Sequence, residues 1–230
     1  MDRKNEPVFT QEQLAGLSEK VRLLLPEKRF LHSAAVCDMV GRLADLYDPG
    51  HKSELQAAGL LHDLTKHWST EDHLRVCREY GIRVTPLDEL TPKTFHAKTA
   101  AALLPDRFPD FATLTVVSAV RWHTTGRAGM TVSERLLYLA DYIDDTRKFP
   151  DCVALRSMFW DAHPERMDDR ERADHLRAVL IASYDMTIRN LLEEGTPVSE
   201  ETISARNDLL LEQARAAMAA RAEAEKEKKE

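Results

Sequence analysis

The sequence is short of the residues that break helices. Its 230 residues include only 8 glycines and 10 prolines, and runs of β-branched residues are few. Such a composition favours helices over strands and disfavours a loop-rich chain. Because 43% of the residues are hydrophobic, the chain can bury a sizeable core and form one main domain.

Cysteine is scarce as well. Cys37, Cys77 and Cys152 are odd in number and widely spaced, and no Cys-x-x-Cys motif occurs. We therefore expect neither a disulfide framework nor a zinc ribbon, but ordinary thiols in a reducing compartment. No apolar stretch approaches the roughly 18 residues that a membrane helix needs, and residues 1–7 lack the apolar core of a signal peptide. These absences predict a cytoplasmic protein with no membrane partner.

Positive charge is in deficit. The formal net charge is -7 at pH 7 and the sequence pI is near 5.8. General binding to nucleic acid needs a basic surface, so this chain is a poor candidate for it. A small anionic substrate remains compatible, because a metal or a few local Arg and Lys residues can supply a positive field.

Apolar residues recur at helical spacing along most of the chain. The predicted helices span residues 11–25, 27–47, 53–66, 70–80, 94–104, 111–122, 132–145 and 168–192, with a last one from Ser199 or Glu200. The predicted N-caps are Thr10, Thr70 and Ser133. A break is expected from Pro105 to Pro109, a loop at 82–92, and no clear pattern at 151–169.

This pattern predicts an all-α helical bundle in three parts. Residues 1–26 would form an N-terminal packing helix, and residues 27–211 the main domain. Residues 212–230 consist almost entirely of Ala, Glu, Lys and Arg, with high helix propensity but no apolar stripe. We expect them to form a charged helical tail that frays into solvent.

The most informative motif is Ala58-Gly-Leu-Leu-His-Asp-Leu-Thr-Lys66. His62 and Asp63 end a helix that is apolar almost all round, so both side chains should be buried. A buried carboxylate costs several kcal/mol unless a cation or a metal lies beside it. An imidazole next to a carboxylate suits zinc, iron or manganese. Lys66, on the same side as Asp63, would either neutralise a phosphate or simply pair with Asp63.

Four further side chains at inward-facing or helix-end positions extend this motif: His32, His96, His123 and Asp141. Each has a simpler explanation on its own, such as a buried histidine bonded to the backbone or a carboxylate between helices. His123-Thr-Thr-Gly126 would suit a phosphate, or else Gly126 is a C-cap and His123 caps free carbonyls. Together, the set favours one shared metal site.

The order His…His-Asp…His…His…Asp resembles that of the HD-domain metal-dependent phosphohydrolases. Four motifs, Arg29-Phe-Leu-His-Ser33, the His62-Asp63 stretch, His123-Thr-Thr-Gly126 and Leu139-Ala-Asp-Tyr-Ile143, are similar to those of the YqeK family within it. This bacterial family hydrolyses diadenosine tetraphosphate symmetrically to two ADP. The resemblance covers residues 29–149 closely and extends more loosely to about residue 210.

The resemblance also implies a role for each residue. His32, His62, Asp63 and Asp141 would hold a first metal ion of the iron type, with manganese or another divalent metal as options. His96 and His123 would serve a second ion or contact phosphate, and with Asp63 they form the expected catalytic group. The residues that would hold the nucleotide phosphates are Arg29, Lys66, Thr124 and Arg147. A homodimer is compatible with this family.

Two other functions remain open at this stage. One is a different HD-domain nucleotide phosphohydrolase. The Leu-Thr-Lys that follows Asp63 differs from the Glu-Asp of guanosine pentaphosphate hydrolases, and the Gly-Tyr-Pro typical of one class of cyclic-dinucleotide phosphodiesterases does not occur. The other is a non-catalytic nucleotide-binding module, which the complete ligand set disfavours.

Overall fold

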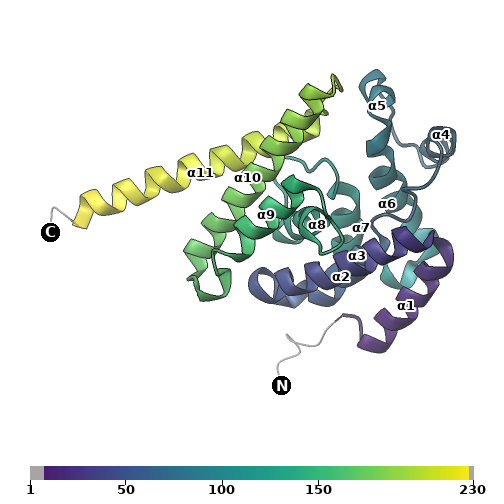
Figure 1. Ribbon diagram of the computed structural model, residues 1–230, viewed down its shortest axis with the longest axis horizontal. Coiled ribbons are helices and arrows are strands. Elements are labelled where there is room, and N and C mark those ends of the chain that lie inside the picture. The colour runs from purple at the N-terminus through teal and green to yellow at the C-terminus, as the bar shows by residue number, and fades with distance from the viewer. Residues whose placement is uncertain (1–7, 228–230) are drawn as a thin grey trace.

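The computed structural model describes residues 8–227, and every regular element in that range is a helix (Figure 1). The α-helices are α1 (Gln11–Leu24), α2 (Glu27–Tyr47), α3 (Lys52–Leu61), α4 (Thr70–Glu79), α5 (Pro86–Leu90), α6 (Phe95–Arg107), α7 (Leu114–Trp122), α8 (Val132–Ile143), α9 (Pro150–Trp160), α10 (Asp169–Glu193) and α11 (Glu200–Glu227). Four short 3-10 helices lie in the connections: Pro49–His51, Pro92–Thr94, Pro109–Phe111 and Pro164–Arg166. The predicted all-α class is confirmed.

Helix α3 lies at the centre of the bundle. Every residue from Ser53 to Leu61 is buried except Gln56, which is half-buried. α3 packs mainly against α2 and α7, and also against α1 and α8. Gly59 permits the tightest of these contacts, since a Cβ there would lie 2.7 Å from the Cα of Cys37 on α2. The end of this buried helix is therefore held rigidly in the core.

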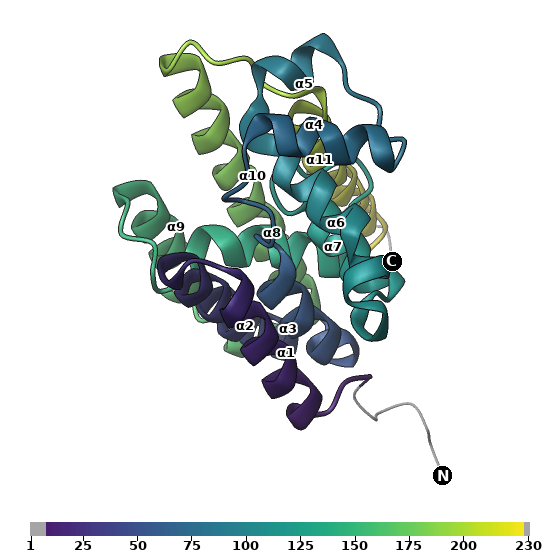
Figure 2. The same ribbon diagram turned by 90° about the vertical axis from the view of Figure 1, so that its right-hand side faces the viewer.

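The remaining helices surround this centre. α6 packs on α7 and carries α4 on its outer side, while α9 contacts α8 and α10. Figure 2 shows α4 and α5 at the opposite end of the molecule from α1. α11 begins against α10 and then extends far from the body (Figure 1).

The C-terminal helix does not fray at residue 212 but continues to Glu227. Glu212 is tied to the bundle, because Arg135 of α8 donates to its carboxylate. Residues 1–7 of the predicted N-terminal part and residues 228–230 of the predicted tail lie outside the described residues. The division into three parts stays a prediction.

Several predicted helix ends were wrong, among them the start of α7, which lies at Leu114 rather than Phe111, and the end of α8, which lies at Ile143 rather than Asp145. α3 ends at Leu61 rather than Lys66, and residues 62–67 form turns instead. α6 does not break at Pro105 but continues to Arg107, where Phe108 N–H closes the last turn on the carbonyl of Leu104.

Two helices were not predicted. α5 lies in the expected loop at 82–92, where Thr85 forms a capping box and Pro86 takes the first helical position. α9 lies in the unassigned segment at 151–169 and also begins with a proline, Pro150. Proline suits this position because the first N–H of a helix has no partner within the helix.

The N-caps agree with the sequence prediction in part. Thr10 caps α1 as predicted, through a complete capping box. α4 is capped by Ser69 rather than Thr70, and α8 by Thr131 rather than Ser133. In each case the cap precedes the predicted residue by one or two positions.

Candidate metal centre

The ends of the central helices bring all six predicted ligands into one cluster. It consists of His32 from α2, His62 and Asp63 just after α3, His96 from the first turn of α6, His123 just after α7, and Asp141 from α8. Neighbouring imidazole rings lie 4.9 to 5.3 Å apart, centroid to centroid. The structure therefore brings the six predicted residues together as one buried group of side chains.

Three of the imidazoles are oriented by their own backbone. His62, His96 and His123 each place Nδ1 at 2.7 or 2.8 Å from the carbonyl oxygen three residues earlier. A carbonyl can only accept, so each Nδ1 carries the hydrogen and each Nε2 keeps a free lone pair. His123 thus caps a helix carbonyl, as its simpler explanation proposed, and also takes part in the cluster.

His32 is oriented by a carboxylate that the sequence reading missed. Its Nδ1 lies 3.4 Å from Asp144 Oδ2 and 3.3 Å from Thr146 Oγ1, and its Nε2 lies 2.9 Å from Asp141 Oδ1. Burial lowers the pKa of His32, but hydrogen bonds to Asp141 and Asp144 outweigh this and raise it to about 9. The only signal for Asp144 was its position three residues after Asp141, one helical turn along the same face.

Two arginines stand at the solvent side of the carboxylates. Arg29 Nη1 donates to Asp63 Oδ2 at 2.8 Å. Arg147 Nη2 donates to Asp141 Oδ1, and its Nε donates to the Asp141 carbonyl at 2.8 Å. Burial opposes the charge on Asp63, but the field of His62 and Lys66 lowers its pKa overall, so Asp63 is ionised.

Lys66 and Thr124 lie against the histidines. Lys66 Nζ is 3.0 Å from His96 Nε2, so the lysine reaches His96 rather than pairing directly with Asp63. Thr124 Oγ1 is 3.0 Å from the Nε2 atoms of both His96 and His123. Burial, together with the charge of Lys66, lowers the pKa of His96 well below its ordinary value and keeps the ring neutral.

The segment that carries His123 and Thr124 is fixed from α10 and α11. Gly126 adopts a φ of +65°, and a Cβ at this position would lie 1.9 Å from the hydroxyl of Tyr184. Thr202 of α11 donates to the carbonyl of Thr125 at 3.2 Å. Asp208 accepts from Gly129 N–H at 2.7 Å. The segment is therefore held in place by α10 and α11, which follow it at a distance in the sequence.

The cluster fits a divalent metal. Buried His62 Nε2 and Asp63 Oδ1 have no hydrogen-bond partner within residues 8–227. Two groups of three residues each have ligand atoms that lie within 4.8 Å of one another. One group is His32, His62 and Asp141, and the other is His62, Asp63 and His123. Burial lowers the pKa of His62, and it lowers that of His123 to about 3. Neutral imidazoles and ionised carboxylates are the forms that bind metal.

Comparison with known proteins agrees with this geometry. Residues 29–146, just over half of the chain, match the HD domain family. The chain belongs to the HD domain family. HD domains bind divalent metals, and this chain has a His/Asp cluster of the required chemistry.

Curated relatives of this HD-domain chain share one name, "Bis(5'-nucleosyl)-tetraphosphatase, symmetrical". The protein of that name from Staphylococcus aureus is 34% identical over 134 residues, which cover 58% of this chain and 68% of that protein. Those from Halalkalibacterium halodurans and Bacillus subtilis are 29% and 27% identical. These alignments cover 82% and 83% of this chain, and 92% and 94% of the relatives. The predicted family resemblance is confirmed.

A solved structure shares the fold of this HD-domain chain. It is described as a predicted HD superfamily hydrolase involved in NAD metabolism, from Clostridium acetobutylicum. The two chains are 27% identical with a TM-score of 0.72, over 86% of this chain and 97% of the other. Within the described part of this chain, no helix is both long and apolar enough to cross a membrane.

Proposed function

We propose that this HD-domain chain hydrolyses diadenosine tetraphosphate symmetrically, giving two ADP. The observation that carries the proposal is the buried His/Asp cluster, whose ligand atoms lie close together beside the guanidinium groups of Arg29 and Arg147. The shared name of the three curated relatives supports the choice of substrate. The chemistry is that of a metal-dependent phosphohydrolase acting on a polyphosphate.

We assign a divalent metal to His32, His62, Asp63 and Asp141, with iron as the first choice and manganese as the second. Such an ion, when bound, supplies Lewis acidity and lowers the pKa of a bound water from about 15.7 towards about 7. Asp63 offers two distinct oxygens. Oδ2 accepts from Arg29, whereas Oδ1 lies 3.4 Å from His96 Nε2 and has no hydrogen-bond partner in the described chain.

His96 and His123 offer lone pairs at Nε2, which suit a second metal ion, and they contact a phosphate oxygen only where an Nε2 gains a proton. Their Nε2 atoms lie 3.0 Å apart, and the ammonium of Lys66 is 3.0 Å from that of His96. A positive charge in this position repels a second cation and attracts an anionic oxygen. We therefore assign Lys66 and the hydroxyl of Thr124, which can both donate, to the phosphate next to the cleaved bond, with His96 and His123 beside them.

In the reaction, a water oxygen bonds to an inner phosphorus while the bond from that phosphorus to the central bridging oxygen breaks. The departing ADP keeps the bridging oxygen, and the attacking water loses a proton to solvent. Arg29 and Arg147 have side chains 35% and 30% exposed, so their guanidinium groups can reach the substrate while they remain paired with the carboxylates. Their charge stabilises the negative charge that develops on the phosphoryl and leaving oxygens.

Product analysis tests this proposal. The purified protein, loaded with manganese or anaerobically with ferrous iron, is incubated with diadenosine tetraphosphate, and nucleotides are separated by anion exchange. ADP as the sole product is expected. AMP with ATP would mean asymmetric cleavage and would overturn the symmetrical assignment. Absence of any product from protein shown to contain metal would favour another HD-domain nucleotide phosphohydrolase, or a nucleotide-binding module without turnover.

Two further properties stay predictions. A cytoplasmic location rests on the three free cysteines, Cys37, Cys77 and Cys152. A homodimer rests on the family alone.

A further inference from the structure

The loop between α8 and α9 carries two side chains that serve the metal centre. Asp144 lies 3.4 Å from His32 Nδ1, and Arg147 donates to both the carboxylate and the carbonyl of Asp141. The segment from Asp144 to Phe149 contains neither proline nor glycine. Because proline would fix φ, a loop without it keeps more backbone freedom and must be held by contacts. The position of both side chains therefore depends on whatever holds this loop.

Arg156 of α9 supplies the contacts that hold the loop. Its Nη1 donates to the carbonyl oxygen of Asp144, and to those of Ile143 at 3.5 Å and Arg147 at 3.4 Å. Its Nη2 also donates to the Arg147 carbonyl, at 3.4 Å. The Arg156 side chain is only 19% exposed, so little water competes for these hydrogen bonds. One guanidinium group thus joins the end of α8 to the middle of the loop.

The three carbonyl groups need such a donor. Ile143 is the last residue of α8, and the carbonyls of a last turn have no partner within the helix. Asp144 turns away from the helix with a ψ of 157°, and its carbonyl accepts from Arg147 N–H at 3.2 Å. All three oxygens lie close to one Nη1 atom, so their negative ends would face one another without a cation between them. A planar guanidinium with several N–H groups satisfies them together.

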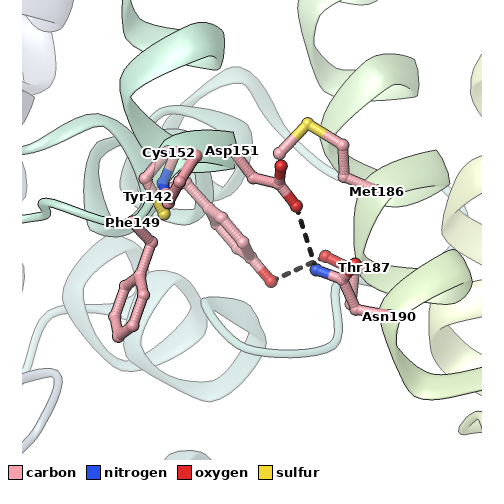
Figure 3. Close-up of a pocket in the computed structure, with 8 residues that line it drawn as sticks. Tyr142, Phe149, Asp151, Cys152, Met186, Thr187 and Asn190 are labelled. Carbon is pink, nitrogen blue, oxygen red and sulfur yellow. Dashed lines mark hydrogen bonds between the residues drawn. The ribbon is translucent and has the colours of Figure 1, made fainter. Parts of the chain in front are cut away.

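Arg156 itself extends from a well-anchored helix. Leu155 and Phe159 of α9 are buried in the core. Figure 3 shows the first turn of α9 facing α10, where Asn190 donates to the carboxylate of Asp151 at 3.2 Å. The guanidinium therefore transmits the position of α9 to the loop, and the loop passes it to the metal centre.

We propose that Arg156 is a positioning residue of the metal centre, which fixes the loop so that Asp144 meets His32 and Arg147 meets Asp141. Its hydrogen bonds within the described chain go to backbone carbonyls, so it acts through the loop and not on the substrate. Its effect on turnover rests on the proposed function. Its effect on metal binding rests on the His/Asp cluster alone.

Metal titration of the full chain, with manganese as the probe, is the first measurement. Arg156→Ala should lower metal affinity by about 10- to 100-fold, the loss typical when a group that orients a ligand is removed. Guanidinium chloride at millimolar concentration should restore part of that affinity, whereas sodium chloride at the same ionic strength should not. Combined with Asp144→Asn, Arg156→Ala should add little further loss, because both substitutions act on His32. Turnover of diadenosine tetraphosphate by metal-saturated Arg156→Ala should also fall, because Arg147 moves with the loop.

Two controls separate positioning from general stability. Arg166→Ala removes an arginine that lies shortly after α9, is 76% exposed and pairs only loosely with Glu165 at 3.6 Å. Phe159→Leu weakens the packing of α9 but keeps the Arg156 guanidinium. Phe159→Leu should therefore lower Tm and leave metal affinity unchanged, and Arg166→Ala should change neither.

Hydrogen exchange of the metal-free protein, followed by mass spectrometry, reports on the loop directly. Thr146 N–H donates to Asp144 Oδ1 at 2.8 Å, and Arg147 N–H to the Asp144 carbonyl at 3.2 Å. In Arg156→Ala, the peptide that covers residues 144–149 should exchange faster than in the wild type. In both controls it should exchange at the wild-type rate.

The outcomes separate this inference from the proposed function. If Arg156→Ala binds manganese as tightly as Arg166→Ala, or exchanges at residues 144–149 as slowly as the wild type, the inference is refuted and the function stands. If the wild-type protein cleaves no diadenosine tetraphosphate, the proposed function fails, and metal affinity and exchange still decide the role of Arg156. Should Arg156→Ala not fold, Arg156→Lys replaces it, with a smaller loss in the same direction because an ammonium lacks the planar fork.

Discussion

Asp144 orients His32 from the side opposite the metal centre, and Asp144→Asn tests how much this support contributes. The carboxylate is fully buried and lies 3.4 Å from His32 Nδ1. It also accepts from the backbone N–H of Thr146 at 2.8 Å and lies 3.4 Å from Arg147 Nε. Asparagine keeps the size and one acceptor oxygen but removes the negative charge, so the local fold should survive.

The substitution acts on two states of His32. Without metal, Asp144 helps to raise the pKa of His32 to about 9, so loss of the carboxylate makes the ring easier to deprotonate and to ligate. With metal, the same carboxylate stabilises a doubly positive centre, which outweighs the single charge of an imidazolium. The net result should be metal affinity or kcat/KM lower by about 10- to 100-fold, or about 1.4 to 2.7 kcal/mol.

The assay is metal titration of chelated protein, followed by metal content and by turnover. Asp145→Asn is the matched control, because its side chain is 74% exposed and makes only loose ion pairs with Arg42 and Arg156, at 3.8 and 3.9 Å. Thermal unfolding of both metal-free variants checks that each is folded. If Asp144→Asn binds metal and turns over as well as Asp145→Asn, our account of how His32 is held is incorrect.

Three further predictions concern the same centre. Asp63→Ala should abolish metal binding and turnover together, because it removes both ligand oxygens. Full turnover with normal metal content would refute the assignment of Asp63 to the metal site. Gly126→Ala should destabilise the fold by about 2 to 5 kcal/mol, from the left-handed backbone and the clash with Tyr184, measured by urea unfolding; a cost under about 1 kcal/mol would contradict the packing described here. Metal-free protein should have its highest Tm near pH 6.5. Above that pH, stability declines because the raised pKa of His32, about 9, favours the folded state only while the ring is protonated. Below it, stability declines because His123, with its pKa lowered to about 3, must stay neutral in the fold while it gains a proton in the unfolded chain. A Tm that rises steadily from pH 5 to pH 9 would refute this balance.

Helix periodicity predicted the scaffold of the site well. The predicted range of α2 agrees with the structure at both ends, and α3, predicted to be apolar almost all round, is buried along most of its length. Both carry long apolar patterns that tertiary contacts reinforce. α5 was missed because it has only 5 residues, and so short a helix depends on its cap and its packing more than on periodicity. α9 has 11 residues but buries only Leu155 and Phe159, so it carries little apolar periodicity.

The wrong cap of α8 has a cause outside the local sequence. Next to α8, Thr131 and Ser133 both offer a hydroxyl, and local sequence does not choose between them. The structure uses the Ser133 hydroxyl to donate to Asp48, a residue 85 positions away, so Thr131 takes the cap. Asp144 was missed for a similar reason, since its importance comes from His32, which lies far from it in the sequence.

The histidine hydrogen bonds to the backbone have a consequence for how the protein acquires its metal. His62 and His123 each close a carbonyl in the last turn of a helix, a group that otherwise lacks a partner. The folding of α3 and α7 therefore aims both lone pairs before any ion arrives. Metal binding should then occur at a preformed site, with little change in the helix content of the protein. Chelation should leave the protein folded, unlike a zinc finger, so the same molecules can be emptied and refilled with a different metal.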